Sequence, residues 1–370
     1  MAKVSLVKCK SYDAADVTAA VRHAVDLLGG IEKFVKRDER VLLKPNLLTD
    51  AEPEKGITTH PEVVRAVIRL LKPLTKNIYC GDSPSVLGER KDIDRVYEVT
   101  GIKSVCREEG VELIYFTKPK MYGAYPLTEW LEKCDRLISL PKFKTHGFTV
   151  LTGGLKNLFG LVTGMYKMKI HRDNPQPNDL CKTIVDIYGI RRPDLTIVDG
   201  VVAMEGEGPG SGGTLRPSEL IAASQDALAM DMVLAKIMGL EPADIPTNRE
   251  AFRRGWQPAD LKAVDIVGEH LQYCILEGFR LPKTTFLNKM PKWAISVIKQ
   301  FLQMKVVVLL DKCQRCHLCQ KICPAGAIGV NEKGALIRRR MCIYCLCCQE
   351  ICPHGAIRVK KSFVLRFLGA

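Results

Sequence analysis

The chain has 370 residues, a net charge of +14 and 46% apolar residues. This length predicts two domains, or one large and one small, and the apolar content suits globular cores. No apolar stretch is long enough to cross a membrane, and the N-terminal residues lack the pattern of a secretory signal peptide, so neither a membrane-spanning nor a secreted protein is expected.

Residues 1–281 alternate β-rich apolar runs with helical patterns, which predicts an α/β domain with a mainly parallel sheet. The predicted strands are 41–43, 77–80, 111–116, 136–140, 195–198 and 220–223. The predicted helices are 13–28, 60–71, 92–109, 180–188 and 226–238, with a break near Gly101 in the third.

Polar residues follow three of these strands where each strand ends, namely Lys44, Asn46, Asp82, Ser83, Lys142, Lys144 and His146. The carboxyl ends of parallel strands form the ligand crevice of open α/β sheets. We therefore expect four lysines to converge on a small anion such as phosphate or carboxylate: Lys44, Lys142, Lys144 and Lys156. The alternative is that each lysine is a solvated surface residue and that His146 is structural.

Two groups of candidate site residues follow from this crevice. The candidate catalytic residues are Lys142, Lys144 and His146, with His146 as the proton donor or acceptor. The candidate anion-binding residues are Lys44, Asn46, Asp82, Ser83, Lys156, Asn157 and Glu205.

The stretch 205–213 is rich in glycine, which lets backbone amides approach a ligand closely. It has neither the Gly-x-Gly-x-x-Gly dinucleotide pattern in a strand–turn–helix setting nor the Gly-x-x-x-x-Gly-Lys-Ser/Thr phosphate loop. It is predicted to be either a flexible turn or a mobile lid over the crevice.

These stretches together resemble one family, the domain of unknown function 362. The resemblance is carried by 43–46 (Leu-Lys-Pro-Asn), 59–62 (Thr-His-Pro-Glu), 81–84 (Gly-Asp-Ser-Pro), 141–146 (Pro-Lys-Phe-Lys-Thr-His), 155–160 (Leu-Lys-Asn-Leu-Phe-Gly), 199–200 (Asp-Gly) and 204–210. The match covers most of 40–255. It implies an α/β fold and an association with a C-terminal ferredoxin-type module, and it supplies no settled substrate.

Residues 282–305 contain five lysines and no acidic residue. Pro291 can begin a helix that runs to about residue 304, with a basic side and an apolar side. Such a helix either lies on an anionic membrane surface or serves as a linker that docks on its own domain. The tail 362–370 repeats the basic and apolar theme.

Two cysteine runs dominate the C-terminal part. Cys313, Cys316, Cys319 and Cys323 precede Pro324, and the same spacing returns 29 residues later at Cys342, Cys345, Cys348, Cys352 and Pro353. This internal repeat resembles the bacterial two-cluster ferredoxin, in which each run holds three ligands of one [4Fe–4S] cluster and one ligand of the other. Paired zinc knuckles are the alternative.

The ferredoxin resemblance implies a crossed set of ligands for two [4Fe–4S] clusters. Cluster 1 would be held by Cys313, Cys316, Cys319 and Cys352. Cluster 2 would be held by Cys342, Cys345, Cys348 and Cys323. A ninth thiol, Cys347, is expected to be a packed side chain, with ligand exchange as a minor alternative.

This ferredoxin module is predicted to cover 306–361 as a small α+β domain. Strands are expected at 306–310 and 357–360, with a hairpin of 327–330 and 335–338 around the turn 331–334. So short a segment has little apolar core, so the clusters act as its core and loss of iron should unfold it.

The charge and the cysteines point to partners and compartment. Residues 282–370 contain 16 Lys and Arg but three Asp and Glu, which favours an acidic redox partner or service to the chain's own α/β domain. Six of the fifteen cysteines are scattered outside the repeat without paired spacing, which predicts a reducing cytoplasm. Peripheral contact with the inner face of a membrane is an open alternative.

Electron transfer through two [4Fe–4S] clusters, to or from the α/β domain or a bound redox partner, is therefore the leading function. The alternative is an oxidoreductase that reduces a small anionic substrate, a carboxylate or phosphate, bound in the α/β domain. Nucleic-acid binding is disfavoured, because no aromatic residues interleave with the basic ones.

Overall fold

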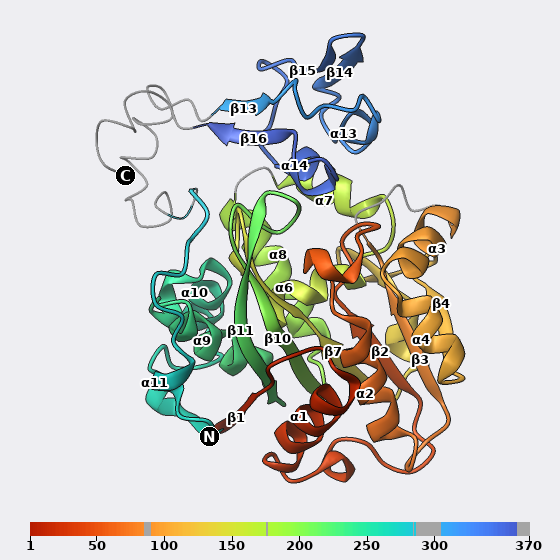
Figure 1. Ribbon diagram of the computed structural model, residues 1–370, viewed down its shortest axis with the longest axis vertical. Helices are drawn as coiled ribbons and strands as arrows, with labels where there is room; N and C mark the ends of the chain where they lie inside the picture. The colour runs from red at the N-terminus through yellow and green to blue at the C-terminus, as the bar shows by residue number, and fades with distance from the viewer. Residues whose placement is uncertain (85–89, 175–176, 284, 286–304, 361–370) are drawn as a thin grey trace.

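The computed structural model describes residues 1–84, 90–174, 177–283, 285 and 305–360. Within them the chain forms a mixed α/β domain with a layer of helices on each face of one sheet, followed by a small C-terminal module made of residues 305–360 (Figure 1). The predicted α/β fold with a mainly parallel sheet is confirmed.

The large sheet is parallel over most of its width. Its strands lie in the order β12 (Val264–Gly268), β1 (Ala2–Lys8), β11 (Gly213–Ser224), β10 (Leu195–Gly206), β7 (Arg136–Leu140), β2 (Val41–Pro45), β3 (Ile78–Asp82) and β4 (Glu112–Tyr115). The strand β11 runs antiparallel to both of its neighbours. The strand β8 (Lys142–His146) pairs with β10 and with β9 (Val150–Thr152).

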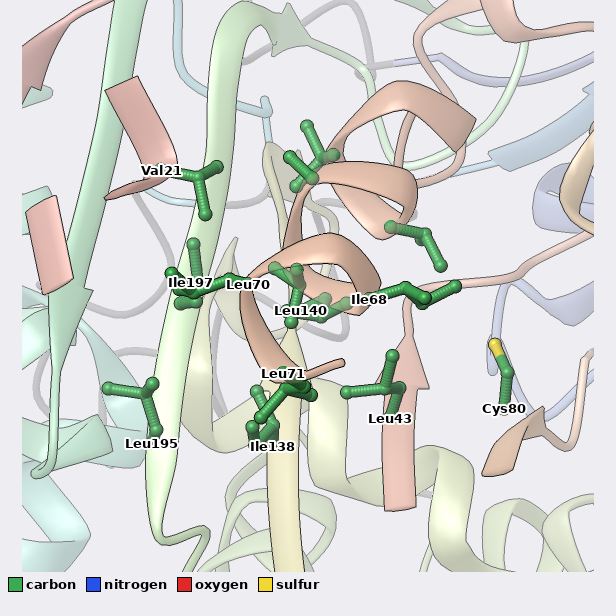
Figure 2. Close-up of a cluster of buried hydrophobic side chains, with 14 of the residues drawn as sticks. Val21, Leu43, Ile68, Leu70, Leu71, Cys80, Ile138, Leu140, Leu195 and Ile197 are labelled. Carbon is green, nitrogen blue, oxygen red and sulfur yellow. The ribbon is translucent and has the colours of Figure 1, made fainter. Parts of the chain in front are cut away.

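Successive residues of the central strands point to opposite faces of the sheet, and both faces are buried. Leu43, Ile138 and Ile197 lie in the cluster beneath one helical layer. Their neighbours Leu42 and Leu137 lie in the cluster beneath the other. Figure 2 shows Leu70 and Leu71 of one helix packing over the strand residues of the first cluster.

The first helical layer consists of α1 (Ala14–Asp26), α2 (Pro61–Leu71), α3 (Arg90–Val99) and α4 (Ile102–Glu108). The opposite layer includes α6 (Gly154–Asn157), α8 (Pro177–Ile190), α9 (Ala227–Ile237) and α10 (Pro246–Arg253). The side chains of Asp13, His60 and Asp226 cap three of these helices, as residues that accept from exposed N-terminal amides do. The predicted break is confirmed at Gly101, whose φ is 76°.

Three strand predictions need correction. The strand that was expected at 220–223 begins earlier, at Gly213, as β11. The strand that was expected at 195–198 continues as β10 to Gly206, with a register shift between Gly200 and Val202. Residues 142–146 were predicted to follow the end of the strand 136–140, and no strand was predicted there, yet they form β8, which pairs with β10 through Lys142 and Lys144. The sequence did not indicate a strand here, because charged side chains are unusual in a buried strand. Those of β8 are nevertheless buried.

Some elements have no counterpart in the sequence-based prediction. They include β1, β12, the hairpin of β5 (Pro119–Tyr122) and β6 (Tyr125–Thr128), and the short helices α5 (Trp130–Lys133), α7 (Tyr166–Asp173) and α11 (Leu271–Cys274).

The C-terminal module has two antiparallel strand pairs and two short helices. They are β13 (Lys305–Val308) with β16 (Ile357–Lys360), β14 (Ile328–Asn331) with β15 (Gly334–Ile337), α13 (Leu318–Lys321) and α14 (Cys347–Ile351). The predicted hairpin is thus confirmed. In Figure 1 the helix α14 lies above α7 and the tips of β10 and β11. The predicted helix 291–304 and the tail 362–370 lie outside the described residues.

Candidate functional site

The eight cysteines of the repeat surround two separate cavities in the module. One is lined by Cys313, Cys316, Cys319 and Cys352, and the other by Cys323, Cys342, Cys345 and Cys348. Within the described residues, no group of three or more His, Cys, Asp or Glu lies close enough together for a single metal ion. Four thiols around a cavity with apolar walls are the donor set of a cysteine-ligated iron–sulfur cube, so these residues fit that group.

The two cysteine loops have the same unusual backbone. Arg315 and His317 in the first loop have positive φ angles, and so do their counterparts Tyr344 and Leu346 in the second. Residues other than glycine rarely adopt this left-handed backbone conformation, which turns the chain tightly between successive cysteines. The amides of Ala327 and Ala356 donate to Sγ of Cys323 and Cys352, each at 3.3 Å.

The two cavities differ in their exposure. Cys316 of the first set is exposed, whereas Cys345 and Cys348 of the second set are buried. The ninth thiol, Cys347, is buried and lines neither of the four-cysteine cavities. It faces instead a third cavity between the module and the α/β domain.

This third cavity, the lysine cavity, is lined by both parts of the chain. The α/β domain supplies residues after β2 and β3 and from β8, α6 and α7, and the module supplies Ile322, Cys347 and Glu350. The lining groups that could bind a ligand are Asn46, Asp82, Ser83, Lys144, His146, Thr152, Lys156, Asn157, Lys167, His171 and Glu350. The volume of this cavity is about 60 Å³, well below the roughly 300 Å³ at which pockets for drug-sized ligands begin.

Three ammonium groups reach the lysine cavity from three elements. Lys144 of β8 donates to the Ile57 carbonyl, Lys167 of α7 donates to the Ser83 carbonyl, and Lys156 of α6 lies 4.9 Å from the ring centre of Phe159. Lys144 is buried, and Lys156 and Lys167 are half-buried. Burial, together with neighbouring lysines, lowers the pKa of all three, to about 7 for Lys144 and Lys167.

A fourth lysine, Lys44, lies behind the lining and is fully buried. Its Nζ is 2.8 Å from Asp82 Oδ1 and donates to Asn157 Oδ1 at 3.3 Å. A side chain on Gly160 would collide with this pair, since its Cβ would lie 2.2 Å from Asp82 Oδ1. The opposite charges of Lys44 and Asp82 cancel, and the pair packs tightly against Gly160.

His146 joins the α/β domain to the module. Its Nδ1 accepts from the amides of Phe148 and Thr149 at 3.2 and 3.3 Å. A nitrogen that accepts is unprotonated, so the proton lies on Nε2, which is 3.2 Å from Glu350 Oε1. Burial lowers the pKa of His146, and a neutral ring therefore donates to the Glu350 carboxylate.

The helix α6, which carries Lys156 and Asn157, is fixed by a buried carboxylate. Asp231 of α9 accepts from the amides of Gly154 at 2.6 Å and Leu155 at 3.1 Å. Burial raises the pKa of Asp231 to about 7 despite these amides. The contact holds the first turn of α6 against α9.

The structure brings most of the predicted site residues together. Asn46, Asp82, Ser83, Lys144, His146, Lys156 and Asn157 line the lysine cavity, and Lys44 supports it. Lys142 is instead paired with Asp199 at 3.0 Å, and Glu205 with Arg280 at 2.7 Å, so neither faces the cavity. Lys167, His171 and Glu350 were missed, because α7 has no strand-end signal and Glu350 lies inside a cysteine run.

The glycine-rich stretch connects β10 to β11 and packs on the module. Ser211 donates to the Cys352 carbonyl at 2.6 Å, and Arg358 donates to the Gly212 carbonyl at 3.0 Å. A Cβ on Gly210 would lie 2.7 Å from the Glu350 carbonyl oxygen. The stretch is thus a docking surface for α14, and the prediction of a lid or a flexible turn missed this role.

Fold and site together define an α/β protein with an iron–sulfur module docked over a lysine-lined cavity. A family model described as "Domain of unknown function (DUF362)" matches residues 41–236, and one described as "4Fe-4S dicluster domain" matches residues 305–353. The chain belongs to the DUF362 family and is an iron–sulfur protein.

One similar curated protein is the "Thylakoid-associated protein sll1697" of Synechocystis sp. It is 34% identical over 287 residues, which cover 76% of this chain and 88% of that protein. Within the described part of the chain, no helix combines the length and the apolar character that crossing a membrane requires.

Two solved structures are similar over part of the chain. The lactate racemase apoprotein of Thermoanaerobacterium thermosaccharolyticum is 10% identical, with a TM-score of 0.38, and the match covers 61% of this chain and 54% of that one. A protein from Thermotoga maritima is 15% identical, with a TM-score of 0.37 and coverage of 60% and 57%. The chain thus spans little more than half the length of either structure.

Proposed function

We propose that this protein carries two [4Fe–4S] clusters and transfers electrons between them and its own α/β domain. The observation that supports this proposal most strongly is the shared lining of the lysine cavity. Cys347 and Glu350 of the module line it together with Lys144 and Lys156 of the domain. Because Cys347 adjoins Cys348, a ligand in this cavity lies beside the second set of thiolates. The exposed Cys316 makes the first set the point of exchange with an external partner.

Iron content tests the number of clusters. Protein reconstituted without oxygen should bind about eight irons, as two cysteine-ligated cubes require. Cys348→Ala should lower this number, whereas Cys347→Ala, the matched control one residue away, should not. A content near four irons, or zinc in place of iron, would refute the two-cluster proposal.

A second candidate function is the reduction of a small anion bound in the lysine cavity. It is favoured by the three lysines that face the cavity without a carboxylate partner in the described part of the chain. Reduced protein should then be reoxidised by the anionic substrate. Lys156→Met should abolish this reoxidation, and the exposed Lys169→Met on α7 should not.

The partner and the location are further proposals. The basic C-terminal part favours an acidic electron donor or acceptor, with an association rate that falls as salt rises. The thylakoid-associated relative and the basic sequence at 282–305 support peripheral contact with an anionic membrane surface from the cytoplasmic side. Sedimentation with anionic vesicles, but not with neutral ones, is the expected result.

A further inference from the structure

The charges that line the lysine cavity do not balance. When protonated, Lys144, Lys156 and Lys167 contribute three ammonium groups, and the salt bridges of the described residues include none of them. Asp82 is neutralised by Lys44. Glu350 accepts from a neutral imidazole, so among the described lining residues it is the one carboxylate that offsets an ammonium group. With all three lysines protonated, two positive charges therefore remain without a counterion in the described part of the chain.

Uncompensated charge is costly where water is excluded. The exposed fraction of Lys144 is 1%, and its Nζ has a carbonyl as its hydrogen-bond partner. A dianion in the cavity would neutralise the two remaining charges. No such argument applies to Lys142, which already has Asp199.

Three polar atoms of the lining also lack hydrogen-bond partners among the described residues. They are Asn46 Oδ1, Thr152 Oγ1 and His171 Nδ1, all fully buried atoms. Thr152 and His171 are 2% and 7% exposed. An amide oxygen accepts but cannot donate, so Asn46 Oδ1 needs a donor from the ligand. Buried polar groups without a protein partner are satisfied by water, an ion or a ligand, because leaving them unpaired is costly.

We propose that the lysine cavity binds a small dianion that also carries a hydroxyl group, either a hydroxylated dicarboxylate or a hydrogenphosphate group. Lys144, Lys156 and Lys167 bind the negative charges, and Asn46 and His171 pair with the hydroxyl. The inference rests on the second candidate function, because it names the chemical class of that function's substrate. The site is incomplete without the module, which supplies Glu350.

The same geometry couples binding to protonation. In the ligand-free protein, burial lowers the pKa of Lys144 and Lys167 to about 7. Lys142, Lys156, Asp82 and Glu350 face Lys144, whereas Lys44, Lys156, Asp82 and Glu350 face Lys167. A bound dianion stabilises both ammonium forms, so binding takes up protons near neutral pH and weakens as pH rises.

Calorimetric titration of the cluster-loaded protein tests the proposal. The probes are malate and inorganic phosphate, which combine two charges with a hydroxyl, succinate, which lacks the hydroxyl, and acetate, which has one charge. Malate or phosphate should bind at least tenfold more tightly than acetate, and succinate should bind more weakly than malate. Heats in two buffers with different ionisation enthalpies should reveal proton uptake. Equal affinities for acetate and both hydroxylated dianions would overturn the proposal.

Variants separate binding from folding. Lys156→Met and Lys167→Met should weaken binding at least tenfold without lowering the thermal midpoint, because each removes an ammonium that lacks a counterion. Lys169→Met, an exposed lysine on the same helix as Lys167, should bind like the wild type. Unchanged binding in both cavity variants would refute the site. Dianion binding without reoxidation of reduced clusters would refute the second candidate function and leave the binding site standing.

Discussion

The single residue Lys144 destabilises the folded α/β domain when no anion is bound. Its ammonium is buried, its partner is the Ile57 carbonyl, and Lys156 and Lys142 are among the charges that face it. A lysine held in this way favours its neutral form. Its protonation is therefore linked both to folding and to whatever anion enters the lysine cavity.

The free energy of unfolding of the ligand-free protein should rise with pH above neutrality. Burial lowers the native pKa of Lys144 to about 7, whereas an unfolded lysine keeps its proton up to about pH 10. The unfolded state binds more protons in this window, so stability rises by up to about 1.4 kcal/mol per pH unit for this group. Denaturant titrations across the window measure the slope. Lys144→Met should reduce it, and an identical slope in the variant would contradict the lowered pKa.

Sequence reasoning located the residues that follow parallel strands, because topology alone brings Asn46, Asp82 and Lys144 to one edge of the sheet. It could not separate Lys142 from Lys144, since both lie on β8 and their partners come from distant segments. Lys167 and Glu350 depend on how α7 and the module dock, which no local pattern encodes.

At the scale of elements, the contact between α14 and the β10–β11 connection joins the two parts of the chain. The backbones of the connection and of α14 come close together there, because Gly210 has no side chain and lies against the Glu350 carbonyl. Similarly, a Cβ added to Gly147 would lie 3.0 Å from the side chain of Leu346, which comes just before α14. The glycines of the connection were visible in the sequence, but the surface that they meet was not.

Gly210→Ala should loosen this docking. The new Cβ would lie 2.7 Å from the Glu350 carbonyl oxygen, and such overpacking typically costs about 1–3 kcal/mol. Hydrogen exchange of the α14 amides should accelerate while the iron content stays unchanged. Gly329→Ala is the matched control, because its Cβ would meet no atom within 4 Å. Equal exchange in the two variants would show that the connection does not hold α14.

The crossed cysteine sets predict which variants resemble each other. Cys323 lines the same cavity as Cys342, although it belongs to the first loop. The electron paramagnetic resonance spectrum of reduced Cys323→Ala should therefore match that of Cys342→Ala and differ from that of Cys313→Ala. A match between Cys323→Ala and Cys313→Ala would refute the crossing.

At the scale of the whole molecule, the module and the α/β domain depend differently on iron. The α/β domain has large apolar clusters on both faces of its sheet, whereas the short strands of the module enclose the two cysteine-lined cavities. Small domains of this kind owe much of their folding free energy to the groups they bind.

Removal of iron by a chelator should therefore unfold the module and leave the α/β domain folded. Thermal unfolding followed by circular dichroism should keep a cooperative transition for the large sheet, while hydrogen exchange protection is lost over 305–360. Loss of the sheet transition together with the iron would show that the two parts fold as one unit.

We propose that the lysine cavity and the cluster of the second cysteine set act as one functional unit. Redox titration of the cluster-loaded protein with and without malate tests this most directly. A bound dianion should lower the midpoint potential of the second-set cluster more than that of the first-set cluster. The expected lowering is roughly 59 mV for each tenfold by which the dianion binds the oxidised cluster state more tightly than the reduced one. The shift should vanish in Lys156→Met. Unchanged potentials at saturating malate would contradict the claim.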